Sequence, residues 1–391
     1  MHILILSDFF PPLVNSGAEN IALEISKGYL EKGNKVSVIT INNSLKKCEL
    51  LITKSQGLTY YQIGFKYNTK LSAFLGLFNP NVLKVINRVI LDNDFKVAHI
   101  HNIHSYISYS VISLLSRHSI PAILTAHDAM SIDYGKYDQG AFDGDTSLNA
   151  SVTYKANQFK IWRKNWKRHN PFRNFIIKYQ FKKLRKIVCV SFELEKLFNA
   201  NGISNTAVIH NGLSEFSLPS EIDVSFFRKK LNISLDDKIL LFAGRISVAK
   251  GFDQVQNLLK IILLKEKNIK LMIVGKKIKF DSEIEKNIIN TGWLSKKEMN
   301  LVYSISDITL VPSIYLDPFP TVVLESMYFG TPVIASIYSG AKEAVIDGIT
   351  GYHVNPFDLD DFERKTFKIL NNFEQAKSMS NESGQEFKKK F

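Results

Sequence analysis

Apolar runs of strand length alternate with amphipathic stretches along the whole chain. In the first half, runs typical of buried strands lie near residues 2–7, 35–41, 58–63, 96–101, 121–126, 186–190 and 206–210. Helical spacing of apolar residues occupies the intervals 18–32, 79–93, 105–118 and 192–200. Apolar strands separated by helices are typical of a parallel sheet that helices cover on both faces.

The second half repeats this pattern after a polar stretch. Its strand-like runs lie near residues 238–243, 269–275, 307–311, 332–336 and 351–354. A chain of 391 residues is long for one hydrophobic core, so two domains are expected. We therefore predict an α/β protein with two Rossmann-like doubly wound domains, residues 1–212 and 213–375, facing a common ligand-binding cleft.

Composition and cysteine use are those of a globular protein of a reducing compartment. Hydrophobic residues make up 45% and charged residues 22% of the chain. Cys48 and Cys189 lie far apart and form no disulfide or metal-binding pattern. The first ten residues are predicted to form a buried strand rather than a signal peptide. Since no apolar run approaches the roughly 20 residues of a spanning helix, we expect a cytoplasmic protein that does not cross a membrane.

Positive charge is concentrated in one segment, residues 155–186. The chain carries 50 Lys and Arg against 37 Asp and Glu, a net charge of +13. Twelve of the basic residues and none of the acidic ones lie in this segment, which leaves 38 basic against 37 acidic residues elsewhere. Aromatic residues are interleaved with the cations: Phe159, Trp162, Trp166, Phe172, Phe175, Tyr179 and Phe181.

This combination is typical of a surface that lies on an anionic membrane, where each cation contributes about 1 kcal/mol. We predict docking on the inner face of the membrane. The residues expected to contact the membrane or acceptor are Trp162, Arg163, Lys164, Trp166, Lys167 and Arg168. Two other interpretations stay open: a solvated basic helix with its aromatic residues packed inward, and a nucleic-acid surface. The second is disfavoured because no nucleic-acid-binding motif accompanies the segment.

Two carboxylates stand eight residues apart within residues 312–351, at Asp317 and Glu325. The pattern places Asp317 in a loop and Glu325 in the second turn of a helix that Pro320 opens, because a first-turn proline loses no hydrogen bond. The free amides and positive dipole end of such a helix favour an anion. A carboxylate on each side of that end suits the hydroxyls of a ligand whose phosphates lie nearby, which is the shape of a nucleotide sugar.

A candidate phosphate-binding element lies upstream. The apolar run 238–243 is followed by Gly244-Arg245, then by Lys250-Gly251 and a helical pattern. Strand, glycine-containing turn and helix is the arrangement with which doubly wound proteins hold phosphate. The fork of Arg245 can bridge two phosphate oxygens, and Lys250 supplies a mobile positive charge. A Walker loop is excluded, because G-x-x-x-x-G-K-[ST] occurs nowhere in the chain.

Together these segments resemble the signature of retaining glycosyltransferases of the GT-B fold, specifically glycosyltransferase family 4 (glycosyl transferases group 1). The resemblance implies that Asp317 and Glu325 take the places of two family glutamates, Asp317 being a departure from the usual residue. It also implies that the Gly-Arg and Lys-Gly pairs grip the nucleoside diphosphate. Residues 209–212 match the family's I-x-N-G motif, and residues 376–391 are expected to form a closing helix that returns to the first domain.

Further residues of the first half take roles from this resemblance. The loop after the first strand carries Ser16-Gly17 where the family typically has Gly-Gly, and backbone there is expected to approach the diphosphate. His127, at the end of strand 121–126, matches a histidine that meets the donor sugar. Separately from the resemblance, the polar and glycine-containing composition of residues 133–149 favours a lid or an acceptor loop within the first domain.

The implied reaction is transfer of a sugar, with retention, from a UDP- or GDP-linked donor to a hydroxyl of a glycan acceptor. The basic aromatic segment favours a lipid-linked acceptor of surface polysaccharide or lipopolysaccharide biosynthesis. The predicted catalytic residues are His127, Arg245, Lys250 and Asp317. Glu325 is expected to hold the ribose, and the donor sugar is expected to contact the backbone of Phe319, Pro320, Thr321 and Val322.

No cofactor and no metal are expected. Asp143-Gly144-Asp145 has the D-x-D spacing of the other glycosyltransferase fold, but it follows a polar sequence instead of a buried strand. His99 and His101 alternate on a strand and can share a face; with His104 they are expected to be structural or to face the acceptor. Two alternative functions stay open: a nucleotide-sugar epimerase on the same fold, and a non-catalytic nucleotide-sugar-binding subunit.

Overall fold

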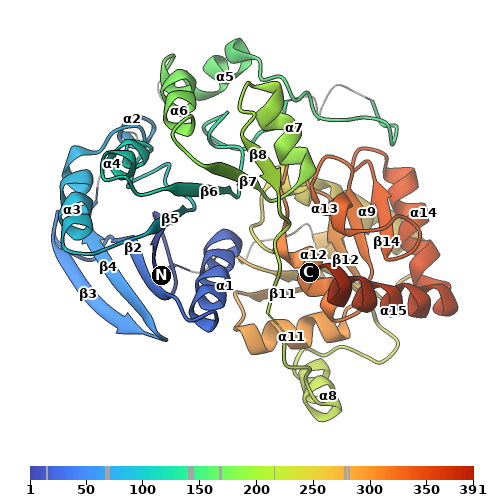
Figure 1. Ribbon diagram of the computed structural model, residues 1–391. Coiled ribbons are helices and arrows are strands. Elements are labelled where there is room, and N and C mark those ends of the chain that lie inside the picture. Colours follow the sequence, from blue (N-terminus) through green and yellow to red (C-terminus); the bar gives the residue numbers. More distant parts are fainter. Residues whose placement is uncertain are drawn as a thin grey trace. The chain divides into compact units, whose positions relative to one another are not determined.

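The chain forms two compact units. Met1–Tyr137 with Tyr154–Asn211 make up the first unit, and Asp138–Thr153 with Gly212–Phe391 make up the second (Figure 1). The computed structural model describes residues 1–14, 16–66, 71–139, 145–166, 170–214, 216–276, 280 and 282–391. Each unit is a sheet with helices on its faces, so the predicted α/β doubly wound class is confirmed.

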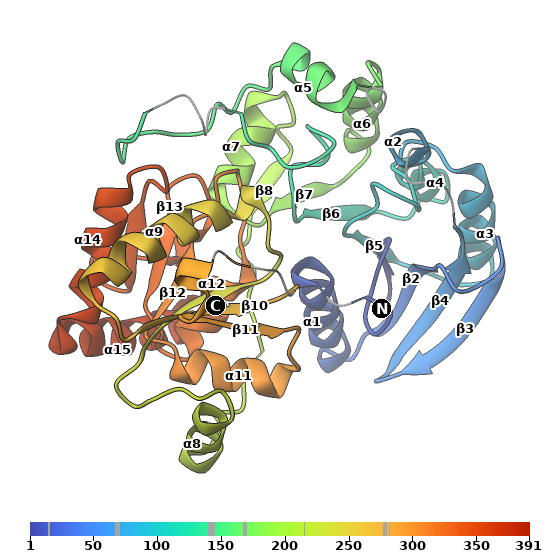
Figure 2. The ribbon, with the colours of Figure 1, turned by 180° about the vertical axis from the view of Figure 1, so that it is seen from behind.

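The sheet of the first unit has the strand order β3-β4-β2-β1-β5-β6-β7-β8. Its strands are β1 (His2–Leu6), β2 (Lys35–Asn42), β3 (Leu50–Ser55), β4 (Leu58–Gly64), β5 (Val97–Ile100), β6 (Ala122–Ala126), β7 (Lys186–Cys189) and β8 (Thr206–Val208). All neighbours are parallel except β3 and β4. The helices, visible from both sides in Figures 1 and 2, are α1 (Gly17–Glu31), α2 (Ser72–Leu75), α3 (Pro80–Leu91), α4 (Val111–Arg117), α5 (Gln158–Asn165), α6 (Arg173–Phe181) and α7 (Phe192–Ala200).

Two elements of this unit differ from the sequence prediction for local reasons. The pattern predicts no strand at β3, an exposed edge strand that pairs antiparallel with β4 across Gln56-Gly57, where φ values of 50° and 79° suit a tight hairpin. The predicted helix 105–118 begins only at Val111. The amides of residues 105–107 instead donate to the buried Asp8 carboxylate at 2.7–3.0 Å.

The second unit contains a parallel sheet in the order β11-β10-β9-β12-β13-β14. Its strands are β9 (Lys238–Ala243), β10 (Ile269–Val274), β11 (Ile288–Gly292), β12 (Ile308–Val311), β13 (Val333–Ser336) and β14 (Gly351–Val354). Its helices are α8 (Glu221–Lys230), the 3-10 turn η3 (Val248–Lys250), α9 (Phe252–Lys265), α10 (Ser282–Glu285), α11 (Lys296–Ile305), α12 (Thr321–Tyr328), α13 (Ala341–Ala344), α14 (Leu359–Leu370) and α15 (Phe373–Lys390). α15 packs against α12 and α14; its return to the first half of the chain stays a prediction.

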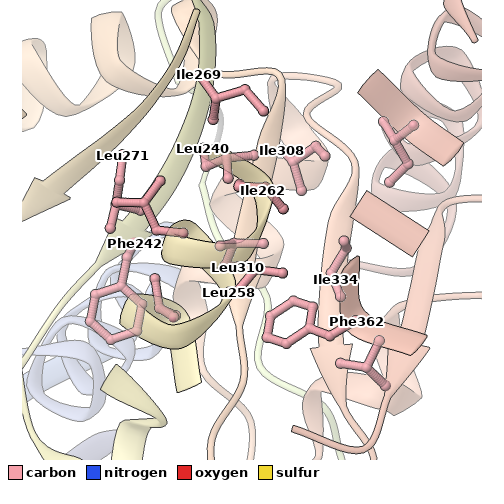
Figure 3. Close-up of a cluster of buried hydrophobic side chains, with 14 of the residues drawn as sticks. Leu240, Phe242, Leu258, Ile262, Ile269, Leu271, Ile308, Leu310, Ile334 and Phe362 are labelled. Atoms are coloured by element: carbon pink, nitrogen blue, oxygen red, sulfur yellow. The ribbon is translucent and has the colours of Figure 1, made fainter. Parts of the chain in front are cut away.

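The core of the second unit lies on both faces of its sheet. Leu240 and Phe242 of β9 pack against Leu258 of α9 in the cluster of Figure 3. Ile239 and Leu241, which alternate with them, join a second cluster on the opposite face. Because side chains of a strand alternate between faces, burial of both faces produces the continuous apolar run seen in the sequence.

Each sheet has a switch point, where connections from neighbouring strands leave in opposite directions. It lies between β1 and β5 in the first sheet and between β9 and β12 in the second. Loops at the carboxyl ends of such strands diverge and leave room for a ligand. The loops 244–251 and 312–320, which carry the predicted donor residues, both start at the switch point of the second sheet.

Candidate functional site

The two predicted donor segments meet in the second unit. The Ile314 amide donates to the carbonyl oxygen of Ala249 at 2.9 Å, which joins the loop after β12 to the loop after β9. The Lys250 ammonium forms an ion pair with the Asp317 carboxylate and lies 5.7 Å from the centre of the Tyr315 ring. Residues 67 positions apart in the sequence therefore form one charged pair.

Glycine at position 251 permits this close approach. Its φ of +76° is left-handed, and a Cβ atom there would lie 1.9 Å from the carbonyl oxygen of Pro312. A Cβ atom on Gly244 would meet nothing within 4 Å, but the backbone φ of +118° there is one that residues with a Cβ atom rarely adopt. The glycines of the Gly-Arg and Lys-Gly pairs thus have a steric reason beside the chemical role of the cations.

Asp317 is buried and held from several sides. Its side chain is 7% exposed. Besides contacting Lys250, Oδ2 accepts a hydrogen bond from the Ser313 hydroxyl at 3.0 Å. The carbonyl oxygen of Asp317 accepts hydrogen bonds from the Gly340 amide at 2.8 Å and the Ser339 hydroxyl at 3.1 Å. These contacts fix the carboxylate in the loop that precedes α12.

Glu325 occupies the second turn of α12, as predicted. The helix begins at Thr321, so Pro320 is its N-cap residue and not its first helical residue. The buried Tyr303 hydroxyl donates to Glu325 Oε2 at 2.6 Å. Burial raises the pKa of the Glu325 carboxyl, although hydrogen bonds from Tyr303 and Thr321 and the charge of Lys296 act in the opposite direction.

The other predicted donor residues of the second unit lie on the same two loops and at the start of α12. Arg245 lies in the same loop as Lys250, is exposed, and has no partner among the residues that the structure describes. Phe319 is buried in the loop before α12. Thr321 and Val322 form the first turn of that helix, whose amides and dipole favour negative charge. Two cations and a helix N-terminus on these adjoining loops suit a ligand that carries phosphate.

In the first unit, three histidines gather at the carboxyl ends of β5 and β6. The rings of His99 and His101 stack with 4.4 Å between their centres, which confirms that the two residues share a face. His101 Nδ1 lies 2.9 Å from Nε2 of His127. Beside them, His104 Nε2 lies 3.4 Å from Oδ2 of Asp128. His101, His104, His127 and Asp128 all line one small polar pocket of this unit.

These three histidines are neutral near pH 7. Burial lowers the pKa of His127 to about 4 and that of His99 to about 3, and it holds the pKa of His101 well below its ordinary value. A neutral imidazole donates or accepts a hydrogen bond without a charge, so His127 suits a sugar hydroxyl better than a phosphate. The buried Nε2 of His101 has no hydrogen-bond partner among the described residues.

Several polar residues of both units support the candidate site residues without belonging to a motif. Asp8 follows β1 and fixes the loop before α4, and Glu19 lies buried in the first turn of α1, where burial raises the pKa of its carboxyl. Their positions after a strand and at a helix start are the available sequence signal. Tyr303 has no such signal, because its partner Glu325 lies on a different helix. Ser313 lies in the same loop as its partner Asp317, four residues before it, but no motif singles it out.

Comparison with known families decides the class of the chain. Residues 15–215 match the family model described as Glycosyltransferase Family 4, and residues 223–386 match that described as Glycosyl transferases group 1. The first match covers more than half of the chain. This chain belongs to glycosyltransferase family 4. The predicted catalytic residues all lie within the matched regions: His127, Arg245, Lys250 and Asp317.

Individual relatives of this family 4 glycosyltransferase match to different extents. A lipopolysaccharide 1,2-N-acetylglucosaminetransferase of Salmonella typhimurium is 37% identical over 142 residues, which are 32% of this chain and 37% of that protein. An uncharacterised glycosyltransferase of Methanocaldococcus jannaschii is 21% identical over 388 residues, or 95% of this chain and 90% of that protein.

Solved structures show that the fold is GT-B. Sucrose-phosphate synthase of Thermosynechococcus elongatus matches with a TM-score of 0.72 and 17% identity, covering 100% of this chain and 94% of that one. Anabaena HepE in complex with UDP and glucose matches with a TM-score of 0.67 and 15% identity, covering 100% and 95%. The predicted GT-B architecture is thereby confirmed.

Two positions depart from the family pattern, and both side chains are engaged. Asp317, at the place of a glutamate, pairs with Lys250. Ser16, at the place of a glycine, is the N-cap residue of α1, and its hydroxyl donates to Glu19. Gly17 is the first residue of that helix. The polar side chain at each of these two positions therefore contacts another polar side chain, Lys250 for Asp317 and Glu19 for Ser16.

The basic aromatic segment displays its rings to solvent. The exposed aromatic side chains are Phe159, Trp162, Trp166, Phe172, Phe175 and Tyr179, with exposed fractions of 40–74%. Phe181 packs inward, and only 3% of its surface is exposed. α5 and α6 lie next to each other in Figures 1 and 2, and the Asn174 amide donates to Gln158 Oε1 at 3.4 Å between them. Inward packing is therefore wrong for most of these rings.

The cations of this segment have different surroundings. Arg163 is exposed, whereas the Lys164 ammonium lies 3.1 Å from Oδ2 of the buried Asp133. Lys167 and Arg168 lie outside the described residues. In the part of the chain that the structure describes, no helix is long and apolar enough to cross a membrane.

The D-x-D motif falls at the edge of the described structure. Asp143 and Gly144 lie outside the described residues. The chain just after them is tied to the second unit, since the buried Asn355 amide donates to the carbonyl oxygens of Asp145 at 2.9 Å and Ser147 at 3.1 Å. Within the described ranges, no group of three or more His, Cys, Asp or Glu side chains is arranged to hold a metal ion.

Proposed function

We propose that this chain transfers a sugar, with retention, from a nucleoside-diphosphate sugar to a hydroxyl of a lipid-linked glycan in surface polysaccharide or lipopolysaccharide biosynthesis. The observation that carries the donor assignment is the junction of Lys250 with Asp317 at the switch point of the second sheet. The solved Anabaena protein with this fold binds UDP and glucose. The Salmonella relative acts on lipopolysaccharide, which supports the acceptor class.

Donor binding divides among five side chains. Arg245 and Lys250 contact the diphosphate, and Glu325 accepts hydrogen bonds from the ribose hydroxyls. Asp317 and the backbone of residues 319–322 orient the sugar. The neutral imidazole of His127 contacts a sugar hydroxyl. All of these groups act without a metal ion.

The reaction exchanges one bond at the anomeric carbon for another on the same face. The bond to the β-phosphate oxygen breaks, a bond from the acceptor oxygen forms, and the acceptor proton passes to the leaving phosphate. Negative charge develops on that phosphate in the transition state. Lys250, Arg245 and the N-terminus of α12 stabilise this charge, because fixed positive groups in a partly buried site need little reorganisation.

Nucleotide binding will raise the melting temperature of the protein selectively. A nucleotide at a hundredfold its dissociation constant stabilises the folded state by about 2.7 kcal/mol. We expect one of UDP, GDP, ADP, CMP and dTDP to give a clear thermal shift that EDTA leaves unchanged. Absence of a shift with all five would contradict a nucleotide site. A shift abolished by EDTA would contradict metal independence.

The proposed acceptor requires attachment to the cytoplasmic face of an anionic membrane through residues 155–186. The wild-type protein will float with vesicles that contain phosphatidylglycerol more than with neutral ones, and salt will weaken the binding. Phe172→Ser with Phe175→Ser will reduce flotation, since both rings are exposed on this segment. Phe226→Ser, an equally exposed ring of α8, is the control and will float like wild type. Equal flotation with neutral vesicles would contradict this attachment.

A further inference from the structure

A pocket of about 360 Å³ opens in the first unit beside α6. Side chains of α6 and the turn that follows it form one wall, and the turn at residues 202–205, which leads into β8, forms the other. The residues that line this pocket belong to the first unit, whereas the loops 244–251 and 312–320 belong to the second. Nothing in the family 4 reaction described above uses it.

The rim of this pocket carries unpaired positive charge. Lys178 and Lys182 line it, and neither side chain has an acidic partner among the described residues. The Lys178 ammonium lies over Gly202, 3.7 Å from the place of a Cβ atom. The neighbouring Lys183 is instead occupied, because its ammonium donates to the Ser113 hydroxyl at 2.7 Å. Two free ammonium groups on one rim favour a phosphate.

The walls below the rim are apolar and aromatic. Phe175 and Tyr179, one turn apart on α6, are 74% and 55% exposed. Phe181, Ile187 and Ile203 are buried and form the inner surface. A free phosphate would leave these rings in water, whereas an amphiphile would cover them and gain from apolar burial. The lining therefore matches a molecule with a phosphate at one end and hydrocarbon at the other.

The far wall is held in place by the backbone. The Asn205 amide donates to the carbonyl oxygens of Leu184 at 3.1 Å and Arg185 at 3.0 Å, which ties the turn before β8 to the turn before β7. Gly202 has a left-handed φ of +76°. The pocket is thus a preformed feature of these two turns, which lowers the cost of ordering it on binding.

We propose that this pocket binds the headgroup of one anionic phospholipid of the membrane. Lys178 and Lys182 contact the phosphate, and Phe175 and Tyr179 cover the glycerol and first methylene groups. The membrane as the source of the ligand rests on the proposed function, because α6 carries two of the exposed rings of the basic aromatic segment, Phe175 and Tyr179. Phe181 also lines the polar pocket of His127, so the bound lipid lies one side chain from that histidine.

The test uses the full chain and short-chain lipids below their micelle concentration. Calorimetry with dihexanoyl phosphatidylglycerol will show one site per chain. Ser204→Trp fills the pocket without changing charge and will weaken this binding at least tenfold, as will Lys178→Gln with Lys182→Gln. The matched control, Arg185→Gln with Lys186→Gln, removes two exposed cations outside the pocket lining and will bind like wild type.

Several outcomes would overturn the assignment. Wild-type affinity in Ser204→Trp would place the lipid elsewhere. Equal affinity for glycerol 3-phosphate would make the pocket a phosphate site without a lipid role, and equal affinity for dihexanoyl phosphatidylcholine would remove the preference for anionic lipid. The nucleotide thermal shift separates this proposal from the proposed function. The nucleotide thermal shift depends on the second unit, so it will persist in the Ser204→Trp variant if that variant is folded.

Discussion

Replacing Lys250 by alanine will lower the turnover number by about a hundred- to a thousandfold while the protein stays folded. This is the usual effect of removing one group that stabilises transition-state charge. The junction of the two loops holds Lys250 beside Asp317. The Lys250 side chain is 26% exposed, so solvent screens its charge only in part. Steady-state kinetics with the nucleotide sugar identified by thermal shift will measure the change.

The matched control is Lys265→Ala. Lys265 also forms an ion pair, with Glu363 at 2.6 Å, but it lies at the other end of α9 and is largely exposed. Its loss will leave turnover within about twofold of wild type, since exposed pairs contribute little. If Lys250→Ala melts early because Asp317 is left unpaired, adding Asp317→Asn will restore stability without restoring turnover. Near-wild-type turnover in Lys250→Ala would rule out the diphosphate assignment.

The alternation of apolar runs and helical stretches is sufficient to predict the architecture. β9 reads as a strand because Leu240 and Ile239 face opposite clusters, both of them buried. β3 escapes the same reasoning, since an exposed edge strand has no apolar face to produce a pattern. The late start of α4 also escapes it, because Asp8, about a hundred positions upstream, competes for the amides of that turn.

In the candidate site, too, local motifs can be predicted from the sequence, whereas contacts between distant elements cannot. The spacing of Asp317 and Glu325 and the Lys-Gly pair are local features, and the structure gathers them at one switch point. The Tyr303 hydroxyl on Glu325 comes from a different helix, and only folding places it there. Local sequence therefore singles out the candidate ligand-binding residues, whereas it does not single out the residues that support them.

The basic aromatic segment shows a further limit of local reasoning. Phe172, Phe175 and Tyr179 follow helical spacing, so the sequence predicts that they share one face of a helix. Whether that face is buried depends on the neighbouring elements. The structure turns these rings outward and leaves Phe181 as the inner contact.

Replacing Glu325 by glutamine will stabilise the folded protein at neutral and higher pH and will weaken nucleotide binding. Burial raises the pKa of the Glu325 carboxyl, so the folded chain binds this proton more tightly than the unfolded chain does. The contribution of Glu325 to folding stability is fully present below the ordinary pKa of a glutamate. It is lost as the pH rises through the raised pKa that Glu325 has in the folded protein. Glutamine is neutral throughout and can still accept the Tyr303 hydrogen bond.

The cost of this substitution appears in binding. A hydrogen bond from a ribose hydroxyl to a carboxylate is stronger than one to a neutral amide by about 1–1.5 kcal/mol, so the dissociation constant of the nucleotide will rise roughly 5- to 13-fold. Calorimetry will measure that change, and melting temperatures from acid to alkaline pH will measure stability. The melting temperature of Glu325→Gln should exceed that of wild type by an amount that grows with pH and vanishes in acid.

Glu298→Gln is the control, because hydrogen bonds from Ser295 lower the pKa of the Glu298 carboxyl. The stabilising effect of Glu298 is present above the ordinary pKa of a glutamate. It is lost as the pH falls through the lowered pKa of Glu298 in the folded protein. Glu298→Gln will therefore melt below wild type at neutral pH, and it will bind nucleotide normally. Wild-type nucleotide affinity in Glu325→Gln would remove Glu325 from the ribose site. A stability gap that narrows with rising pH would contradict the direction of its pKa, since only a carboxyl that prefers its proton in the folded state gains from neutralisation as the pH increases.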